Sequence, residues 1–139
     1  MWPQKMLMVK PDFFDIKYSI NPYMVDKAGQ LKKIDKDRAL RQWENLKEKF
    51  ESLDMQVEVL EGQPGLPDMV FCANQMFPFY KNNSLQLVLS HMHSVQRQNE
   101  VRHFYEWATQ KNIECYEIST GKKSFEGMGD LLWNYETQE

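Results

Sequence analysis

The sequence predicts an α/β fold in which short buried strands alternate with amphipathic helices. Apolar runs of four or five residues alternate with segments whose apolar residues recur every three or four positions. The order helix, strand, turn occurs twice along the chain, which indicates a β/α repeat of about fifty to sixty residues. The chain has 139 residues, of which 42% are hydrophobic. We therefore expect one folded domain over residues 1–139.

The first half contains two predicted strands around one predicted helix. Residues 6–9 form an apolar run that ends before Pro11, which is typical of a buried strand. A helix is predicted from about Asp35, because apolar residues recur at helical spacing: Leu40, Trp43, Leu46, Phe50 and Leu53. Residues 57–60 then read as a strand, ended by the Gly-Gln-Pro-Gly turn at 62–65.

The second half repeats this order with more strands. Residues 69–73 and 85–89 are predicted to be short buried strands. Ser94 is placed to cap a helix whose apolar side chains are Val101, Phe104, Tyr105 and Ala108. Residues 113–118 form the next predicted strand, and another is predicted to begin at Asp130.

The two halves align at corresponding elements. Val57 corresponds to Ile113, and the segment around Asp68 resembles the segment around Asp130. A repeat that cannot bury both faces alone needs neighbouring repeats. One interpretation is a domain that ends on an edge strand. We favour the other, that the chain is the front portion of a larger repeat protein.

Composition excludes several classes of partner. The formal charge of −3 is unfavourable for binding the phosphates of nucleic acid. The apolar runs are too short to cross a membrane, and the first residues do not read as a signal peptide. Two cysteines without a paired spacing suit a reducing cytoplasm.

The simplest catalytic or metal-binding candidates have structural explanations. His91 and His93 alternate along the chain and would share one face of a strand, but no third ligand has an obvious spacing. We therefore predict no metal site. Cys72 and Cys115 lie in apolar runs, where a free cysteine usually behaves as a small hydrophobic residue.

Polar residues beside the predicted strands are more informative. Asn21, Asp68 and Asn74 lie at turns or strand ends, and Glu126 lies in a Gly-rich turn. Arg97 continues the apolar face of the second helix, so it needs a buried anion, from either the protein or a substrate. Turn capping or an internal ion pair explains each residue taken alone. Together they offer the groups that a small zwitterionic ligand requires.

Three segments in this order resemble an enzyme family. They are Gly-Leu-Pro-Asp-Met-Val-Phe-Cys-Ala-Asn at 65–74, Arg-Gln-Asn-Glu at 97–100 and Phe-Glu-Gly-Met-Gly-Asp at 125–130. This pattern is similar to the dimethylarginine dimethylaminohydrolase and amidinotransferase group of the pentein superfamily. The resemblance implies a propeller of ββαβ-type units, of which about two and a half of five blades would be present here.

The resemblance also implies roles for particular residues. In this family a cysteine attacks the guanidinium carbon and a histidine protonates the leaving amine, without a metal or organic cofactor. Glu126 would bind the guanidinium at the catalytic centre, beside Asn74, where many relatives carry Asp. Arg97 would bind the substrate carboxylate, and Asn21 would contact the substrate. Asp68 and Asp130, in the first and third segments, complete the expected substrate-binding residues.

The family's cysteine and histidine have no counterpart among the matching positions, because both belong to the second half of that fold. The resemblance therefore implies the N-terminal part of an enzyme acting on arginine or a methylated relative. Its reaction would be hydrolysis of a linear amidine or amidino transfer. One alternative is a non-catalytic binding or assembly module. Another is half of a split enzyme that assembles with a separate C-terminal half. A homodimer that pairs through exposed strand edges is a further expected partner arrangement.

Overall fold

The computed structural model describes residues 4–119, 121 and 123–134. The chain divides into two compact units, one ending at Val70 and the other beginning at Phe71. Each unit combines parallel strand pairing with a helix, so the predicted α/β class is confirmed. Over the part of the chain described, no helix has the length and apolar character needed to span a membrane.

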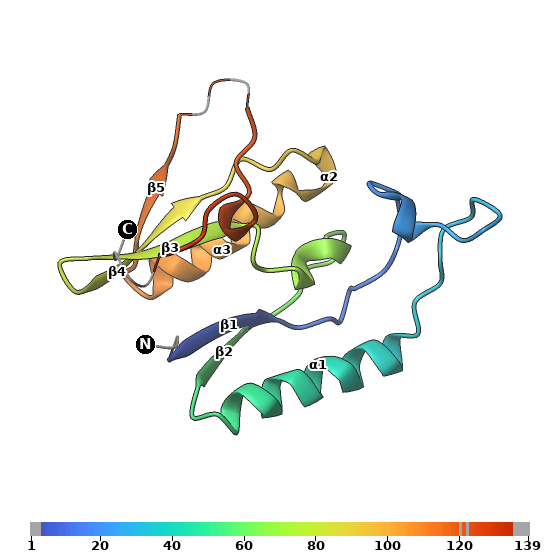
Figure 1. Cartoon of the computed structure of the whole chain (residues 1–139), viewed down its shortest axis with the longest axis horizontal. Coiled ribbons are helices and arrows are strands. Elements are labelled where there is room, and N and C mark those ends of the chain that lie inside the picture. Colours follow the sequence, from blue (N-terminus) through green and yellow to red (C-terminus); the bar gives the residue numbers. More distant parts are fainter. Residues whose placement is uncertain (1–3, 120, 122, 135–139) are drawn as a thin grey trace. The chain divides into compact units, whose positions relative to one another are not determined.

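The first unit is built on two parallel strands. β1 (Lys5–Val9) pairs in register with β2 (Gln56–Leu60), and α1 (Lys36–Glu51) connects them and packs against β2. Figure 1 shows this strand–helix–strand arrangement, with a 3₁₀ helix (Pro22–Met24) on the long connection before α1. Both predicted strands and the predicted helix of this half are thus present.

The helix α1 begins as the sequence predicts but buries less than expected. The Asp35 side chain accepts a hydrogen bond from the Arg38 backbone N–H, which caps the first turn. No residue of α1 is fully buried; Leu46 is 49% exposed, and Leu53 lies beyond the last helical residue and is 60% exposed. The apolar stripe is therefore only half covered within the described residues.

The second unit contains a mixed three-stranded sheet. β3 (Met76–Lys81) pairs antiparallel with β4 (Ser84–Leu89), which pairs parallel with β5 (Glu114–Glu117). α2 (Val95–Gln98) and α3 (Glu100–Gln110) connect β4 to β5, and Figure 1 shows α3 lying along the sheet. Leu87, Met92 and Phe104 are at most 1% exposed and form the centre of the core.

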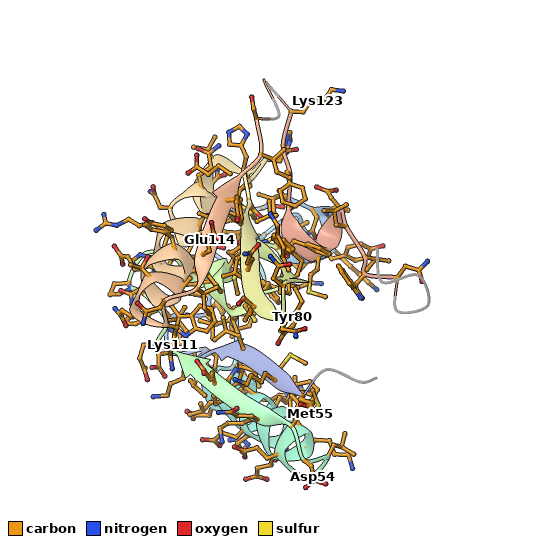
Figure 2. All side chains as sticks on the ribbon, turned by 90° about the vertical axis from the view of Figure 1, so that its left-hand side faces the viewer. Asp54, Met55, Tyr80, Lys111, Glu114 and Lys123 are labelled. Carbon is orange, nitrogen blue, oxygen red and sulfur yellow. The ribbon has the colours of Figure 1, made fainter. Side chains whose placement is uncertain are left out.

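Two turns fix the sheet of the second unit. Asn82 and Asn83 both have positive φ, at 52° and 60°, which suits the tight hairpin between β3 and β4. Asn112, with φ of 55°, reverses the chain between α3 and β5. Figure 2 labels Lys111 and Glu114 on either side of that reversal. Asparagine tolerates this backbone region better than most residues.

The predicted strand at residues 69–73 is wrong. Residues 67–70 form a 3₁₀ helix (Pro67–Val70), and the strand begins later, at Met76. Proline at the first position favours the helical φ angle, and the Asp68 carboxylate is held by a tyrosine hydroxyl. Pro78 makes the strand β3 difficult to predict from the sequence, because proline is unfavourable inside a sheet. β3 tolerates Pro78 because its described pairing is with β4 alone.

The strand predicted to begin at Asp130 is absent from residues 130–134; the rest of it lies outside the described residues. A 3₁₀ helix (Gly127–Gly129) precedes this segment. The repeated order is nevertheless present, because parallel strand, helix, parallel strand and 3₁₀ helix occur in both units. The described residues form no closed sheet, and the number of blades stays a prediction.

Candidate active site

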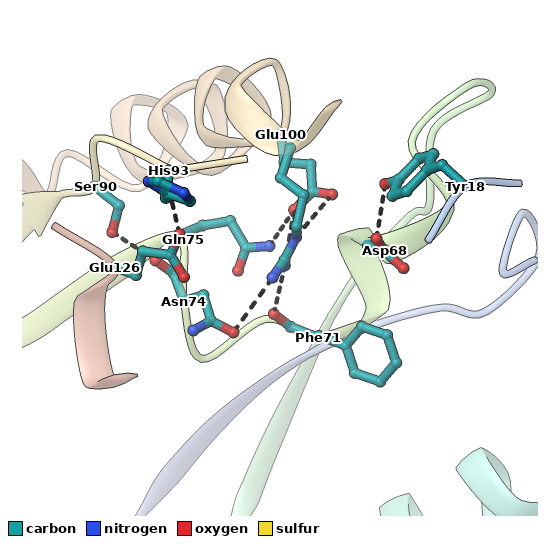
Figure 3. Close-up of polar contacts among 10 residues, drawn as sticks. Tyr18, Asp68, Phe71, Asn74, Gln75, Ser90, His93, Glu100 and Glu126 are labelled. Carbon is teal, nitrogen blue, oxygen red and sulfur yellow. Dashed lines mark hydrogen bonds and ion pairs between the residues drawn. The ribbon is translucent and has the colours of Figure 1, made fainter. Parts of the chain in front are cut away.

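Arg97 is buried at the end of α2 and pairs with a carboxylate of this chain. Arg97 is 6% exposed, and Glu100, the first residue of α3, is 0% exposed. Arg97 Nη2 lies 2.9 Å from Glu100 Oε2, and Nε donates to the same oxygen at 3.1 Å. Nη2 also donates to the Phe71 carbonyl oxygen at 3.1 Å. In Figure 3, dashed lines mark these contacts at the labelled Glu100 and Phe71.

Glu100 receives a second, neutral donor. Gln75 is 0% exposed, and its Nε2 donates to Glu100 Oε2 at 2.5 Å. A buried carboxylate is stable only when charge and hydrogen bonds compensate the loss of water. Arg97 and Gln75 together supply that compensation, and they join the segment before β3 to the start of α3.

Asn74 lies beside this buried pair. Its Oδ1 is 3.5 Å from Arg97 Nη1, a long hydrogen bond, and its backbone carbonyl accepts one from the Ser90 hydroxyl. A Cβ added to Gly129 would lie 3.0 Å from Asn74 Nδ2 and 3.9 Å from Glu126 Cβ. Asn74 and Glu126 therefore both lie beside Gly129, which has no side chain to fill the space next to them.

Both the side chain and the backbone N–H of Glu126 form hydrogen bonds. The His93 backbone N–H donates to Glu126 Oε1 at 2.9 Å (Figure 3). The Glu126 backbone N–H donates to Asp130 Oδ2 at 2.7 Å. Asp130 is one of the predicted substrate-binding residues, and the contact observed for its carboxylate is with the Glu126 backbone N–H in the same turn.

Gly127 allows the Glu126 turn to pack against the Ala73 and Met76 carbonyl groups, in the segment that carries Asn74 and leads into β3. Its φ is +52°, and an added Cβ would collide with the Met76 carbonyl oxygen and lie 3.0 Å from the Ala73 carbonyl oxygen. The Met128 backbone N–H donates to the same Ala73 carbonyl at 2.9 Å. Only glycine combines this backbone angle with such a close approach.

Asn21 and Asp68 belong to the first unit, and each has a local contact there. Asn21 Oδ1 accepts a hydrogen bond from the Tyr23 backbone N–H and caps the 3₁₀ helix (Pro22–Met24). Asp68 is 2% exposed, and its Oδ2 accepts a hydrogen bond from the Tyr18 hydroxyl at 2.7 Å. The second unit thus brings together Asn74, Arg97, Glu126 and Asp130 of the six expected site residues.

The histidines and cysteines do not form a site of their own within the described residues, where no cluster of three metal-ligating side chains occurs. His91 Nδ1 lies 3.1 Å from the Lys123 carbonyl oxygen. Cys72 and Cys115 are half-buried and form no disulfide, and burial raises the pKa of Cys115, which disfavours a nucleophilic thiolate.

A cavity of about 320 Å³ lies at the carboxyl ends of β4 and β5. Its lining includes Ser90, His91 and Glu117, together with Val101 from α3. It adjoins the candidate site through Ser90, which binds the Asn74 backbone, but the lining includes neither Arg97 nor Glu126.

Two members of the buried cluster were missed by the sequence analysis as functional residues. Glu100 lies three residues after Arg97, a spacing that brings side chains together on a helix. This spacing and the inward direction of Arg97 could have indicated Glu100 as its partner. No sequence signal indicates Gln75, because a single polar residue after a predicted strand is common.

The comparisons with known proteins identify the family. Residues 10–138 match the model of eukaryotic N,N dimethylarginine dimethylhydrolase. The chain belongs to the dimethylarginine dimethylaminohydrolase family. The predicted resemblance is therefore confirmed.

Curated relatives in this family are longer than this chain. The chain is 33% identical over 132 residues to the bifunctional arginine dihydrolase/ornithine cyclodeaminase ArgZ of Synechocystis, covering 95% of this chain and 17% of that protein. It is 32% identical to the dimethylarginine dimethylaminohydrolase of Mycobacterium tuberculosis, covering 93% of this chain and 39% of that enzyme. The chain thus spans well under half the length of these two relatives.

Solved structures give the same assignment. The N-terminal domain of ArgZ bound to its product matches with a TM-score of 0.83 and 32% identity, covering 96% of this chain and 46% of that one. The binary complex of an AgrE variant with L-arginine matches with a TM-score of 0.78 and 34% identity, covering 92% of this chain and 18% of that one. These neighbours support the pentein-type α/β fold.

Proposed function

We propose that this chain forms the guanidine-binding part of an enzyme domain that acts on arginine or a close derivative. The proposal rests on the clustering of Asn74, Arg97 and Glu126 in one unit, where Asn74 and Glu126 both lie beside Gly129. The solved relatives include one bound to L-arginine, which supports the same substrate class.

The chemistry of these groups suits the proposed ligand. A carboxylate such as Glu126 binds a planar guanidinium through paired charge-assisted hydrogen bonds and stabilises its positive charge. The Asn74 amide supplies a neutral acceptor beside it. The guanidinium of Arg97 attracts a carboxylate at the other end of the ligand.

The covalent step would require groups outside the matching segments. In the family a cysteine thiolate attacks the guanidinium carbon to form a thiouronium intermediate, and a histidine protonates the leaving amine. Cys115 is an unsuitable substitute, because burial raises its pKa and disfavours the nucleophilic thiolate. We propose that the chain alone binds ligand without turning it over.

A titration of the ¹⁵N-labelled chain tests the proposal. L-arginine should shift the backbone amides of His93 and Gly129, which lie beside Glu126 and Asn74. Citrulline keeps the amino acid but replaces the guanidinium with a neutral group, so it should shift them much less. We expect a dissociation constant of about millimolar for arginine, since an open site loses much of its binding energy to water. Equal effects of the two ligands would overturn the proposal.

A further inference from the structure

The contacts of Glu100 suggest a role beyond stabilising the fold. Its carboxylate is 0% exposed, and donors from Arg97 and Gln75 converge on it. The neighbouring ion pair on the same helix, Arg102 with Glu106, is exposed and points to solvent, with side chains 77% and 42% exposed. Glu100 is thus distinguished by burial and by the residue that it holds.

The geometry of the guanidinium explains what Glu100 controls. Arg97 contacts Glu100 through Nε and Nη2, which form one edge of a rigid planar group. Fixing that edge fixes the direction of Nη1 as well. Nη1 lies on the side of Asn74, 3.5 Å from its Oδ1. The direction in which Arg97 faces the candidate site is therefore set by Glu100.

Gln75 is a second link between Glu100 and the candidate site. It follows Asn74 in the chain, and its Nε2 donates to Glu100 Oε2. Its Oε1 is buried and accepts no hydrogen bond from the described residues. Burying an unsatisfied amide oxygen is unfavourable. The hydrogen bond from Gln75 Nε2 to Glu100 is the polar contact that compensates for burying this side chain.

We propose that Glu100 is a positioning residue for substrate recognition, and that Gln75 orients Glu100. This inference rests on the proposed function. Glu100 holds Arg97 so that its Nη1 side receives the α-carboxylate of an arginine-like ligand. Guanidino compounds without a carboxylate gain nothing from this arrangement.

The test compares two ligands and three variants of the full chain. L-arginine carries the α-carboxylate, and agmatine is the same molecule without it. Glu100→Gln removes the charge that holds Arg97, and Gln75→Leu removes only the donor that orients Glu100. Glu106→Gln is the control. It breaks an arginine–glutamate pair on the same helix, but that pair is exposed to solvent. Circular dichroism and ¹⁵N spectra first establish which variants are folded.

We expect both site variants to weaken arginine binding by about threefold to tenfold, the loss typical of one hydrogen bond, and to leave agmatine binding unchanged. Glu106→Gln should alter neither. If Glu100→Gln does not fold, Gln75→Leu decides the question. An unchanged preference for arginine over agmatine in a folded site variant would overturn the proposal.

Failure of the proposed function gives a different result. In that case the unmodified chain binds neither arginine nor agmatine. The role of Glu100 is then decided by the Nε–H resonance of Arg97, which should be protected from exchange in the unmodified chain and in Glu106→Gln. It should lose protection in Gln75→Leu. Unchanged protection there would show that Gln75 does not orient Glu100 toward the guanidinium, and unchanged protection in Glu100→Gln would show that Glu100 does not hold it.

Discussion

Arg97 and Glu100 form a buried ion pair in which Nη2 lies 2.9 Å from Oε2, three residues apart at the junction of two helices. The sequence left open whether the buried arginine pairs with a protein carboxylate or with a substrate. The structure shows the protein carboxylate. A ligand carboxylate would therefore meet a guanidinium whose charge is already partly compensated, which limits the affinity it can gain.

Gly127→Ala should destabilise the chain strongly. The added methyl group would meet the Met76 carbonyl oxygen at a backbone angle that alanine rarely adopts. We expect a loss of about 3 kcal/mol or more in the free energy of unfolding, combining backbone strain with overpacking. Gly65→Ala is the matched control, because Gly65 has φ of +83° but open space around its Cβ position. It should cost about 1 kcal/mol.

Urea unfolding of the two variants measures both values. Equal losses for Gly127→Ala and Gly65→Ala would mean that backbone strain alone matters, and that the Glu126 turn does not depend on close packing against the Asn74 segment.

Tyr18→Phe should destabilise the first unit. The variant removes the hydroxyl that donates to the Asp68 carboxylate, which is 2% exposed. Removing a donor from a buried carboxylate costs about 1–3 kcal/mol, so a lower urea midpoint is expected. Tyr23→Phe serves as the control, because Tyr23 is 83% exposed and should change stability by less than about 0.5 kcal/mol. Similar midpoints for the two variants would contradict this role of Tyr18.

The sequence predicted the strands of the parallel pairs better than it predicted the structure of residues 69–73. Residues 6–9, 57–60 and 85–89 are short apolar segments of the kind typical of buried strands, and all three lie in strands. Residues 69–73 look the same in sequence, but the hydrogen bond from the distant Tyr18 hydroxyl to Asp68 and the preceding proline favour a 3₁₀ helix. Short apolar runs cannot report such contacts from distant residues.

The candidate site was predictable in part. The motif pattern selected Asn74, Arg97 and Glu126, which lie in one unit, and the inward direction of Arg97 followed from helical spacing. The partner of Arg97 was not decided, because periodicity gives the face of a helix but not the ion pair formed there. The roles of the Asp130 carboxylate and of Gln75 depend on tertiary contacts alone.

Cys115 should make stability depend on pH in the alkaline range. Burial raises its pKa above the usual 9.0, because the thiolate is poorly solvated in the folded chain. Above about pH 9 the unfolded thiol ionises while the folded thiol remains protonated. Stability is therefore retained below the unfolded pKa and falls as the pH rises through the folded pKa.

Urea unfolding between pH 7 and 11 checks this dependence in the chain and in Cys115→Ala. The neighbouring Tyr116 also has a raised pKa, chiefly through its hydrogen bond with Glu114. The difference between the two chains removes that contribution and should grow less favourable for the unmodified chain as pH rises. A difference that is flat across this range would contradict the assignment to Cys115.

Glu126→Gln should abolish detectable arginine binding while preserving the fold. The variant keeps an oxygen that can accept the hydrogen bond from the His93 backbone, but it removes the charge that attracts a guanidinium. Calorimetry should therefore show a loss of at least about tenfold in affinity, since charge-assisted hydrogen bonds contribute about 1.5–3 kcal/mol. Glu117→Gln, on the neighbouring cavity, should leave arginine affinity unchanged. A citrulline and ammonia assay on the same samples should detect no turnover, because burial raises the pKa of Cys115 and disfavours the thiolate that a covalent step needs. Turnover that survives purification and disappears in Cys72→Ser or Cys115→Ser would show that the nucleophile lies within this chain.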